Sequence, residues 1–166
     1  MGDPRRLKKK FKKPAHPFQK DRMLEELEFL GKYGLRNKRE FWKSRTILGN
    51  WRGIARHSRT LPKERAVEVQ QTLIKKLQRL GVLGPEAKFE DVLHLTVEDL
   101  LKRRLQSLVY EKGLAGTIYE ARQKIVHGHI QVKDKKIDAP SYIVKKDEED
   151  LISFTAKSPF LSLIHI

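Results

Sequence analysis

The stretch from Arg103 to Val144 reads RRLQSLVYEKGLAGTIYEARQKIVHGHIQVKDKKIDAPSYIV and predicts two helices followed by extended chain. The first helix should begin at Thr96, a favourable cap with acidic residues in its first turn, and end at Gly113. The second should begin at Thr117, where a glutamate three residues later fits a capping box, and end at Gly128. The residues expected on their apolar faces are Leu100, Leu101, Leu105, Leu108 and Val109, then Ile118, Ala121, Ile125 and Val126.

After Gly128 the pattern changes from a helical to an alternating period. Residues 129–132 alternate like a strand, residues 133–136 form a basic turn, and residues 142–144 resume extended structure. We interpret the acidic segment 147–150 as a solvated turn and residues 151–154 as the last strand. Two helices packed on a small antiparallel sheet is the economical assembly, because each of these elements has one apolar face to bury.

Three helical segments precede this module. They are expected from residue 21 to Gly31 or Gly34, from residue 37 or 38 to about residue 57, and from Pro62 to residue 80. The apolar positions of the first are Met23, Leu24, Leu27 and Leu30. The sequence therefore predicts an α+β fold: a basic extended arm over residues 1–20, a small helical domain over residues 21–100, and the two-helix and sheet domain over residues 101–160.

The charge of the chain points to a polyanionic partner. Lysine and arginine number 36 against 21 acidic residues, a net charge of +15. Nucleic acid is the leading candidate, because each phosphate that a cation neutralises releases condensed counterions. The first 65 residues hold 20 basic and 7 acidic residues, and the rest is nearly balanced. We therefore expect the first part to act as an electrostatic anchor and the second to recognise its partner by geometry.

The arm over residues 1–20 carries seven cations between residues 5 and 13 and is interrupted by prolines. Such a segment is expected to order only against phosphates, and Phe11 and Phe18 are candidates for stacking on bases. A solvated tail or a localisation signal is the alternative for the arm taken alone. The cations of the arm that we expect to bind RNA are Arg5, Arg6, Lys8, Lys9 and Lys10.

The second helical segment is rich in arginine, which suits bidentate contacts with phosphate. Its two tryptophans, Trp42 and Trp51, are nine residues apart and should lie on opposite faces, with one in the core and the other at the surface. The residues expected to bind RNA here are Arg36, Lys38, Arg39, Lys43, Arg45, Arg52 and Arg56.

Composition excludes several other classes of protein. The chain has no cysteine, which rules out disulfides, thiolate catalysis and cysteine-ligated metal sites. It has no apolar run of about 18 residues and no secretory signal. His127 and His129 lack nearby partners for a metal site, and we expect no metal and no cofactor. The acidic residues Glu120, Asp134 and Asp138 do not make a defensible acid–base pair.

Several motifs in order resemble the small-subunit ribosomal protein four family in its archaeal and eukaryotic form, including its RNA-binding S-four domain. In the module they are RRLQ (103–106), GLA (113–115), IYEARQ (118–123), HGHIQV (127–132) and IDAPSY (137–142). Upstream and downstream they are YGLRNKRE (33–40), RLGV (79–82) and KSPF (157–160). The resemblance covers nearly the whole chain. Some members of the family carry a cysteine zinc knuckle, which is absent here.

The resemblance implies a structural constituent of the small ribosomal subunit that binds small-subunit rRNA early and nucleates assembly. It also implies neighbouring ribosomal proteins as partners, a cytoplasmic location in the ribosome, no membrane and no homo-oligomer. A-form RNA is recognised by its shape, phosphates and 2′-hydroxyls. Such recognition requires a rigid scaffold whose basic side chains extend only a short distance from it. The residues of the module that the resemblance places against RNA are Arg103, Arg104, Gln106, Lys112, Arg122, Gln123, His127, Lys133, Lys135, Lys136, Ser141 and Tyr142.

Three other functions compete with this one. An enzyme that uses the same domain as an accessory needs a catalytic domain, and no such domain is identifiable, so we expect no enzymatic activity. A ribosome-biogenesis factor that binds precursor rRNA has the same two-domain plan and remains the alternative. A protein of membrane surfaces is disfavoured, because the cations are not confined to the face opposite an apolar stripe.

The last six residues, Leu161 to Ile166, match neither the basic tail of the family nor a designed terminus. They are what the bases CTGTCTCTTATACACATC encode, which is the start of a transposon-type sequencing adapter. Our hypothesis is that this tail is not native, and we attach no function to it.

Overall fold

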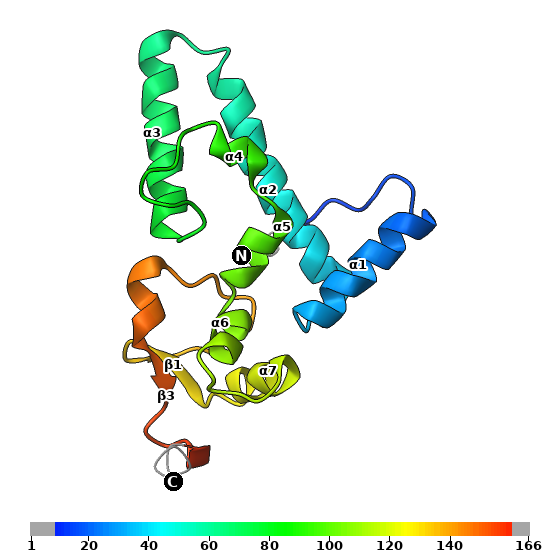
Figure 1. Cartoon of the computed structure of the whole chain (residues 1–166), viewed down its shortest axis with the longest axis vertical. Coiled ribbons are helices and arrows are strands. Elements are labelled where there is room, and N and C mark those ends of the chain that lie inside the picture. The colour runs from blue at the N-terminus through cyan, green and yellow to red at the C-terminus, as the bar shows by residue number, and fades with distance from the viewer. Residues whose placement is uncertain (1–8, 161–166) are drawn as a thin grey trace, which may run out of the picture.

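The computed structural model describes residues 9–160, and its elements follow one another from the helical part to the sheet (Figure 1). They are α1 (Lys20–Lys32), α2 (Lys38–Ser58), α3 (Lys63–Arg79), α4 (Asp91–His94), α5 (Val97–Lys102), α6 (Leu105–Glu111), α7 (Ile118–Val126), β1 (Ile130–Val132), β2 (Lys135–Lys136), η1 (Lys146–Leu151, a 3₁₀ helix) and β3 (Ile152–Phe154). Helices and a small antiparallel sheet confirm the predicted α+β class. Among these helices none is long and apolar enough to cross a membrane.

Helices α2 and α3 lie side by side and hold the main core of the helical part (Figure 1). The side chain of Asn37 caps α2 by accepting the backbone N–H of Glu40 at 3.3 Å. From α2 Trp51 belongs to this core, and from α3 Leu77 is fully buried there. Burying one leucine stabilises the fold by about 2 kcal/mol, and the short helices α4 and α5 complete the same core with Val92 and Leu100.

Helix α1 packs on α2 through an unexpected face. Phe29 stacks on Phe41 with ring centroids 5.2 Å apart, and Glu26 is 1% exposed. The prediction that Leu24 and Leu27 lie on the buried side is wrong, since these side chains are 56% and 52% exposed. The reason is that the Glu26 carboxylate is well partnered: it accepts hydrogen bonds from Arg22 at 2.6 Å and from the Trp42 indole at 3.0 Å. The helix can therefore bury this polar face.

The two tryptophans of α2 divide as expected. Trp51 is buried in the core, and Trp42 is half-buried at the contact with α1.

The helix expected from Thr96 to Gly113 is interrupted, which is a correction to the prediction. The capping box at Thr96 is present, but α5 ends at Lys102 and α6 begins at Leu105. Between them the backbone of Arg104 is extended (φ −73°, ψ 143°) and forms a bridge with Ile143. Backbone hydrogen bonds from segment 142–144 therefore replace the helical ones that are lost. The break separates the core of the helical part from the core of the module that follows.

The C-terminal module packs α6 and α7 on a three-stranded antiparallel sheet of order β2-β1-β3. Thr117 caps α7 by accepting the backbone N–H of Glu120 at 3.1 Å. In the sheet Ile130 pairs with Phe154 and Val132 with Ile152, so alternate residues of β1 and β3 face the helices. The buried residues of this core are Leu105, Leu108, Val109, Ala115, Ala121, Ile125, Ile130, Val132, Val144, Ile152 and Phe154.

Residues 142–144, which were expected to be extended, contribute one β-bridge, between Ile143 and Arg104. A further sequence expectation is wrong in this module. The acidic segment 147–150 is not merely solvated, because it belongs to η1 and Glu148 is 7% exposed. The Tyr142 hydroxyl donates to Glu148 at 2.8 Å, and Arg103 donates to Glu149 at 2.7 Å. The acidic residues of η1 therefore hold the chain beside the helix break.

Candidate nucleic-acid interface

Glu40 of α2 joins the helical part to the C-terminal module. Its carboxylate accepts hydrogen bonds from Arg104 Nη2 at 2.6 Å and from Arg122 Nη2 at 2.7 Å. Gln106 lies beside them, and its amide donates to the carbonyl of Gly34 and to that of residue 118, both at 3.0 Å. Because these groups come from the turn before α2, from α2, from α6 and from α7, they fix α2 relative to the α6–α7 pair. We call Gly34, Glu40, Arg104, Gln106 and Arg122 the interdomain hub.

Two hub residues that were expected on the RNA-facing surface are buried. Arg104 is 4% exposed and Gln106 is fully buried. The extended backbone at the helix break turns the Arg104 side chain toward α2, where Glu40 pairs with it. Their placement on an outward face was therefore wrong, and in this structure they hold the two parts of the chain together. The Arg122 side chain is 22% exposed and also binds Glu40.

The hub keeps Glu40 ionised. Burial alone raises the pKa of the Glu40 carboxyl, but hydrogen bonds from Arg122 and Arg104, together with their charges, bring this pKa below its ordinary value. Burial also lowers the pKa of Arg104, although an arginine remains charged at neutral pH. One carboxylate therefore balances one of two guanidinium groups, and a positive charge remains at the partly exposed end of the hub.

Gly34 is required at the hub by its backbone conformation and by space. Its φ is +55°, which favours glycine, and a Cβ atom there would lie 2.7 Å from Gln106 Nε2. The close approach lets Gln106 reach the Gly34 carbonyl.

Cations of α2 lie on two flanks of the helix. Arg39 and Lys43, one turn apart, lie on one flank, and Arg45 and Arg56, three turns apart, lie on the other. All four are exposed and, within residues 9–160, their side chains form no ion pair or hydrogen bond. Arg36, just before the helix, is in the same state. Such cations are available to phosphates without breaking an internal contact.

Two other cations of α2 that were expected to bind RNA are engaged within the protein. Lys38 pairs with Glu26 at 3.3 Å, and Arg52 donates to the carbonyl of Leu95. Both are half-buried.

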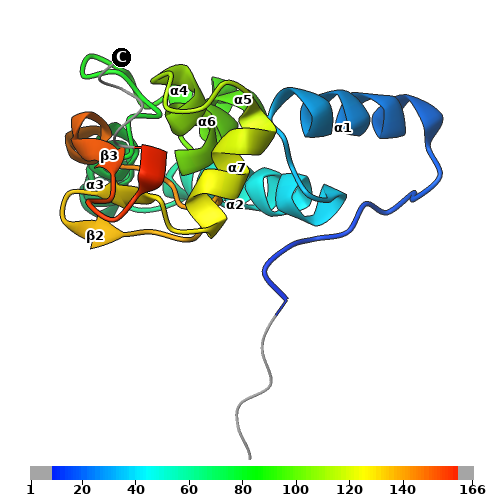
Figure 2. The ribbon, with the colours of Figure 1, turned by 90° about the horizontal axis from the view of Figure 1, so that it is seen from below.

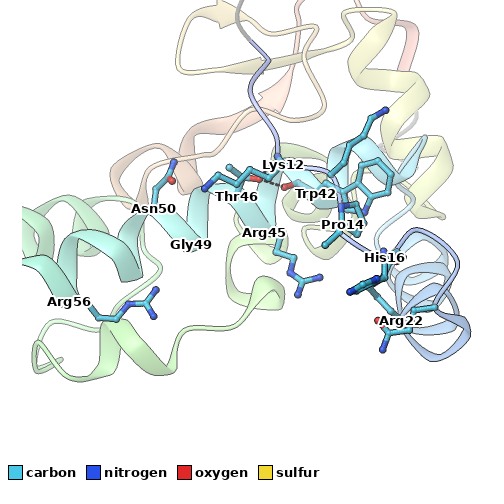
Figure 3. A pocket seen from close by; sticks show the side chains of 13 residues that line it. Lys12, Pro14, His16, Arg22, Trp42, Arg45, Thr46, Gly49, Asn50 and Arg56 are labelled. Carbon is cyan, nitrogen blue, oxygen red and sulfur yellow. Dashed lines mark hydrogen bonds between the residues drawn. The ribbon is translucent and has the colours of Figure 1, made fainter.

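A groove of about 520 Å³ lies between the arm and α2 (Figure 3). Arg22 closes one end, because it donates to the carbonyls of His16 and Pro17 at 2.7 and 2.8 Å. The other cations of the groove are exposed, and an aromatic ring and amide groups lie among them. Its lining residues are Lys12, Lys13, Pro14, Ala15, His16, Gln19, Arg22, Trp42, Arg45, Thr46, Gly49, Asn50 and Arg56. Cations beside an aromatic ring suit a nucleic-acid strand.

The described part of the arm, in dark blue in Figure 2, runs from beside α2 to the start of α1 at that helix's far end. The backbone N–H of Lys12 donates to Thr46 at 3.0 Å, and Phe11 contacts Trp42 with ring centroids 6.1 Å apart. Lys9 lies over the Phe11 ring, 5.0 Å from its centroid. These contacts join Phe11 and Lys12 to α2, and the expectation that the arm orders only against RNA stays a prediction. Lys10 is exposed, whereas the expected contacts Arg5, Arg6 and Lys8 and the tail 161–166 lie outside the described residues.

In the C-terminal module the expected contacts divide into exposed and engaged side chains. The exposed side chains that form no ion pair or hydrogen bond within residues 9–160 are Gln123, His127, Lys135, Lys136 and Ser141. Three cations pair with carboxylates of η1: Arg103 with Glu149 at 2.7 Å, Lys112 with Asp150 at 3.6 Å and Lys133 with Glu148 at 3.7 Å. Tyr142 is half-buried, and burial together with the hydrogen bond to Glu148 raises its pKa.

The two histidines near the end of α7 are placed differently from each other. The His127 ring lies 6.3 Å from that of His129, which packs edge-on against Phe160 at 5.1 Å. His127 is exposed and His129 half-buried, so His127 is the one open to a ligand.

The chain is similar to known proteins over nearly its whole length. Residues 103–151 match the S4 domain family, beginning at the helix break. The chain is 52% identical over 160 residues to the small ribosomal subunit protein uS4 of Hyperthermus butylicus. This match covers 96% of the chain and 91% of the relative. The chain belongs to the uS4 family. The uS4 proteins of Ignicoccus hospitalis and Saccharolobus islandicus strain L.S.2.15 are 48% and 51% identical, over 96% and 98% of this chain and 96% and 90% of theirs.

Within this uS4 chain, sequence reasoning missed two features of the candidate interface. The first is Glu40. It could have been noticed in the sequence, because it is the sole acidic residue between positions 36 and 59, in a segment otherwise rich in cations. The second is the set of groove residues around Asn50 and Thr46, which no local pattern marks. They line one groove with Lys12, whose backbone N–H donates to Thr46 from 34 positions away in the sequence.

Proposed function

We propose that this uS4 protein is a structural constituent of the small ribosomal subunit and binds small-subunit rRNA early in assembly. The relatives carry the name of a small ribosomal subunit protein, which favours a constituent over the alternative of a biogenesis factor. The proposal includes a non-enzymatic role, a cytoplasmic location in the ribosome, contacts with neighbouring ribosomal proteins, and action as a single copy.

The interdomain hub is the observation that carries this proposal. Arg104 and Arg122 of the module meet Glu40 of α2 at 2.6 and 2.7 Å, so the cations of α2 are held at a fixed distance from those of the module. A rigid array of this kind suits folded RNA, whose phosphates also stand at fixed positions. A flexible chain of equal charge would bind any polyanion equally well.

The two halves contribute differently to binding. The unpaired cations along α2 and in the groove supply the long-range attraction, because exposed and uncompensated charges release the most counterions. The module supplies fewer free charges, since several of its cations pair with η1. Its exposed side chains at the end of α7 and on β2 are the ones we propose for close contact with RNA.

The test is hydroxyl-radical footprinting of small-subunit rRNA from Saccharolobus islandicus with the full chain, combined with a salt titration of affinity. We expect a compact protected region at nanomolar protein and no comparable protection of large-subunit rRNA. Equal protection of both RNAs would reject specific binding. Co-sedimentation with mature small subunits distinguishes a constituent from a factor that is found only with precursors.

A further inference from the structure

The outward face of α1 differs in charge from the rest of the molecule. Its exposed residues include Asp21, Leu24, Leu27 and Glu28, and Glu25 lies at its edge. We call these five residues the α1 outer face. It carries three carboxylates in a chain whose net charge is +15. In Figure 2 α1 extends away from the other helices.

The α1 outer face does not serve the fold of the described chain. Within residues 9–160 the carboxylates of Asp21, Glu25 and Glu28 form no ion pair or hydrogen bond, whereas Glu26 on the opposite face binds Arg22 and Trp42. Leu24 and Leu27 are more than half exposed. Two leucines side by side on one helix present an apolar patch that water solvates poorly.

The same face is unsuited to RNA. Carboxylates repel phosphates, and the cations of α2 whose side chains form no ion pair or hydrogen bond within residues 9–160 (Arg39, Lys43, Arg45 and Arg56) lie on another helix. Lys32, at the end of α1, is already paired with Glu98 at 2.9 Å. A ligand for the α1 outer face must therefore bring both positive charge and apolar side chains.

We propose that the α1 outer face docks a basic, partly apolar segment of a neighbouring small-subunit protein. The inference rests on the proposed function and names the kind of partner that this surface takes. Leu24 and Leu27 are the apolar contacts at its centre, and the three carboxylates pair with lysine or arginine around them. Gly31 continues the face with open space above it, which allows the partner backbone to approach the helix closely.

Photo-crosslinking tests this proposal. The full chain, with Leu24 replaced by p-benzoylphenylalanine, is assembled into small subunits from Saccharolobus islandicus RNA and proteins. The crosslinked partner is then identified by mass spectrometry. The matched control carries the same residue at Val67 of α3, which is 51% exposed. We expect a crosslink from position 24 to a protein with a lysine- or arginine-rich segment, and no crosslink to that protein from position 67.

Charge reversal gives a second test of the proposal. Glu25→Lys with Glu28→Lys should reduce the position-24 crosslink at least tenfold, while the exposed pair Glu64→Lys with Glu68→Lys on α3 should leave it unchanged. A crosslink to rRNA or to a second copy of this chain would overturn the inference. So would an assembled particle with no protein crosslink, or a crosslink that charge reversal does not alter. Failure of the chain to enter particles, seen by sedimentation, would instead reject the proposed function and this inference with it.

Discussion

Replacing Glu40 with glutamine tests whether the interdomain hub holds the two parts of the chain together. Glutamine has nearly the same shape but no charge, so the variant keeps the packing and removes the ionic partner of Arg104 and Arg122. The Arg104 side chain is only 5% exposed, so its guanidinium would be left buried without a counter-charge. Glu40→Gln is therefore expected to lower the free energy of unfolding.

The size of the loss follows from the exposure of each partner. Breaking a buried ion pair by removing one side costs about 3–5 kcal/mol. The Glu40 and Arg122 side chains are 21% and 22% exposed, so water screens that pair and it contributes less. Glutamine also still accepts a hydrogen bond. We therefore expect a loss of about 3 kcal/mol, carried mostly by Arg104, and a fall in Tm of about 6–12 °C for a chain of this size.

Urea unfolding followed by circular dichroism measures this loss, with Glu68→Gln as the matched control. Glu68 lies on the exposed side of α3 and forms no ion pair with any residue from 9 to 160, so its substitution should change stability by less than about 0.5 kcal/mol. If Glu40→Gln were no more destabilising than the control, the hub would not be what joins the two parts.

Acid should reduce the difference between the wild type and Glu40→Gln. The pKa of Glu40 in the folded chain lies below its ordinary value of 4.5. The ionised carboxylate therefore contributes its full stability above about pH 4.5 and loses it as the pH falls through the lower folded value. The difference in unfolding free energy between the wild type and Glu40→Gln should therefore shrink as the pH falls below 4.5. A difference that stays constant over the whole acid range in which both proteins are folded would contradict the assignment.

Three further predictions follow from single contacts. Arg45→Ala with Arg56→Ala should weaken rRNA binding and lower the slope of log affinity against log salt by about 2, as a titration would show. Gly34→Ala should destabilise the chain by about 2 kcal/mol in urea because of its φ of +55°, whereas Gly49→Ala, with open space around it, should stabilise it slightly. Thr117→Ala should cost about 1 kcal/mol through loss of the α7 cap, measured in the same way.

The parts of the fold that local sequence determines were predictable. The caps at Asn37 and Thr117 and the change of period after Gly128 mark where helices begin and strands follow. These signals act over a few residues, so the α+β class could be predicted from them and is confirmed, whereas α4, the break between α5 and α6, β2 and η1 were not predicted. The domain limits at residues 20, 100 and 160 stay predictions, although the S4 match begins close to the second of them.

Features that depend on distant residues could not be predicted. The break before α6 exists because Ile143 bridges Arg104 from 39 positions away, while the apolar spacing through the break remains helical. The face that α1 buries depends on Trp42 being within reach of Glu26. Among the expected RNA contacts, Arg104 and Gln106 were misplaced for the same reason. From sequence alone a basic or polar residue on a helix is predicted to be exposed, because a partner in another element that would bury it is not known.

Substitution of Glu40 distinguishes two ways in which this chain can bind RNA, by its net charge and by the fixed placement of α2 relative to the C-terminal module. Glu40 is an acid within the most cationic segment, so its removal raises the net charge from +15 by one and should slightly strengthen binding to any polyanion. The same change frees α2 from the module and should weaken binding to an RNA that fits both at once, because the relative placement must then be fixed on binding. Opposite changes in affinity for nonspecific and small-subunit RNA are therefore the signature of recognition by geometry. A parallel increase for both would mean that charge alone holds the RNA.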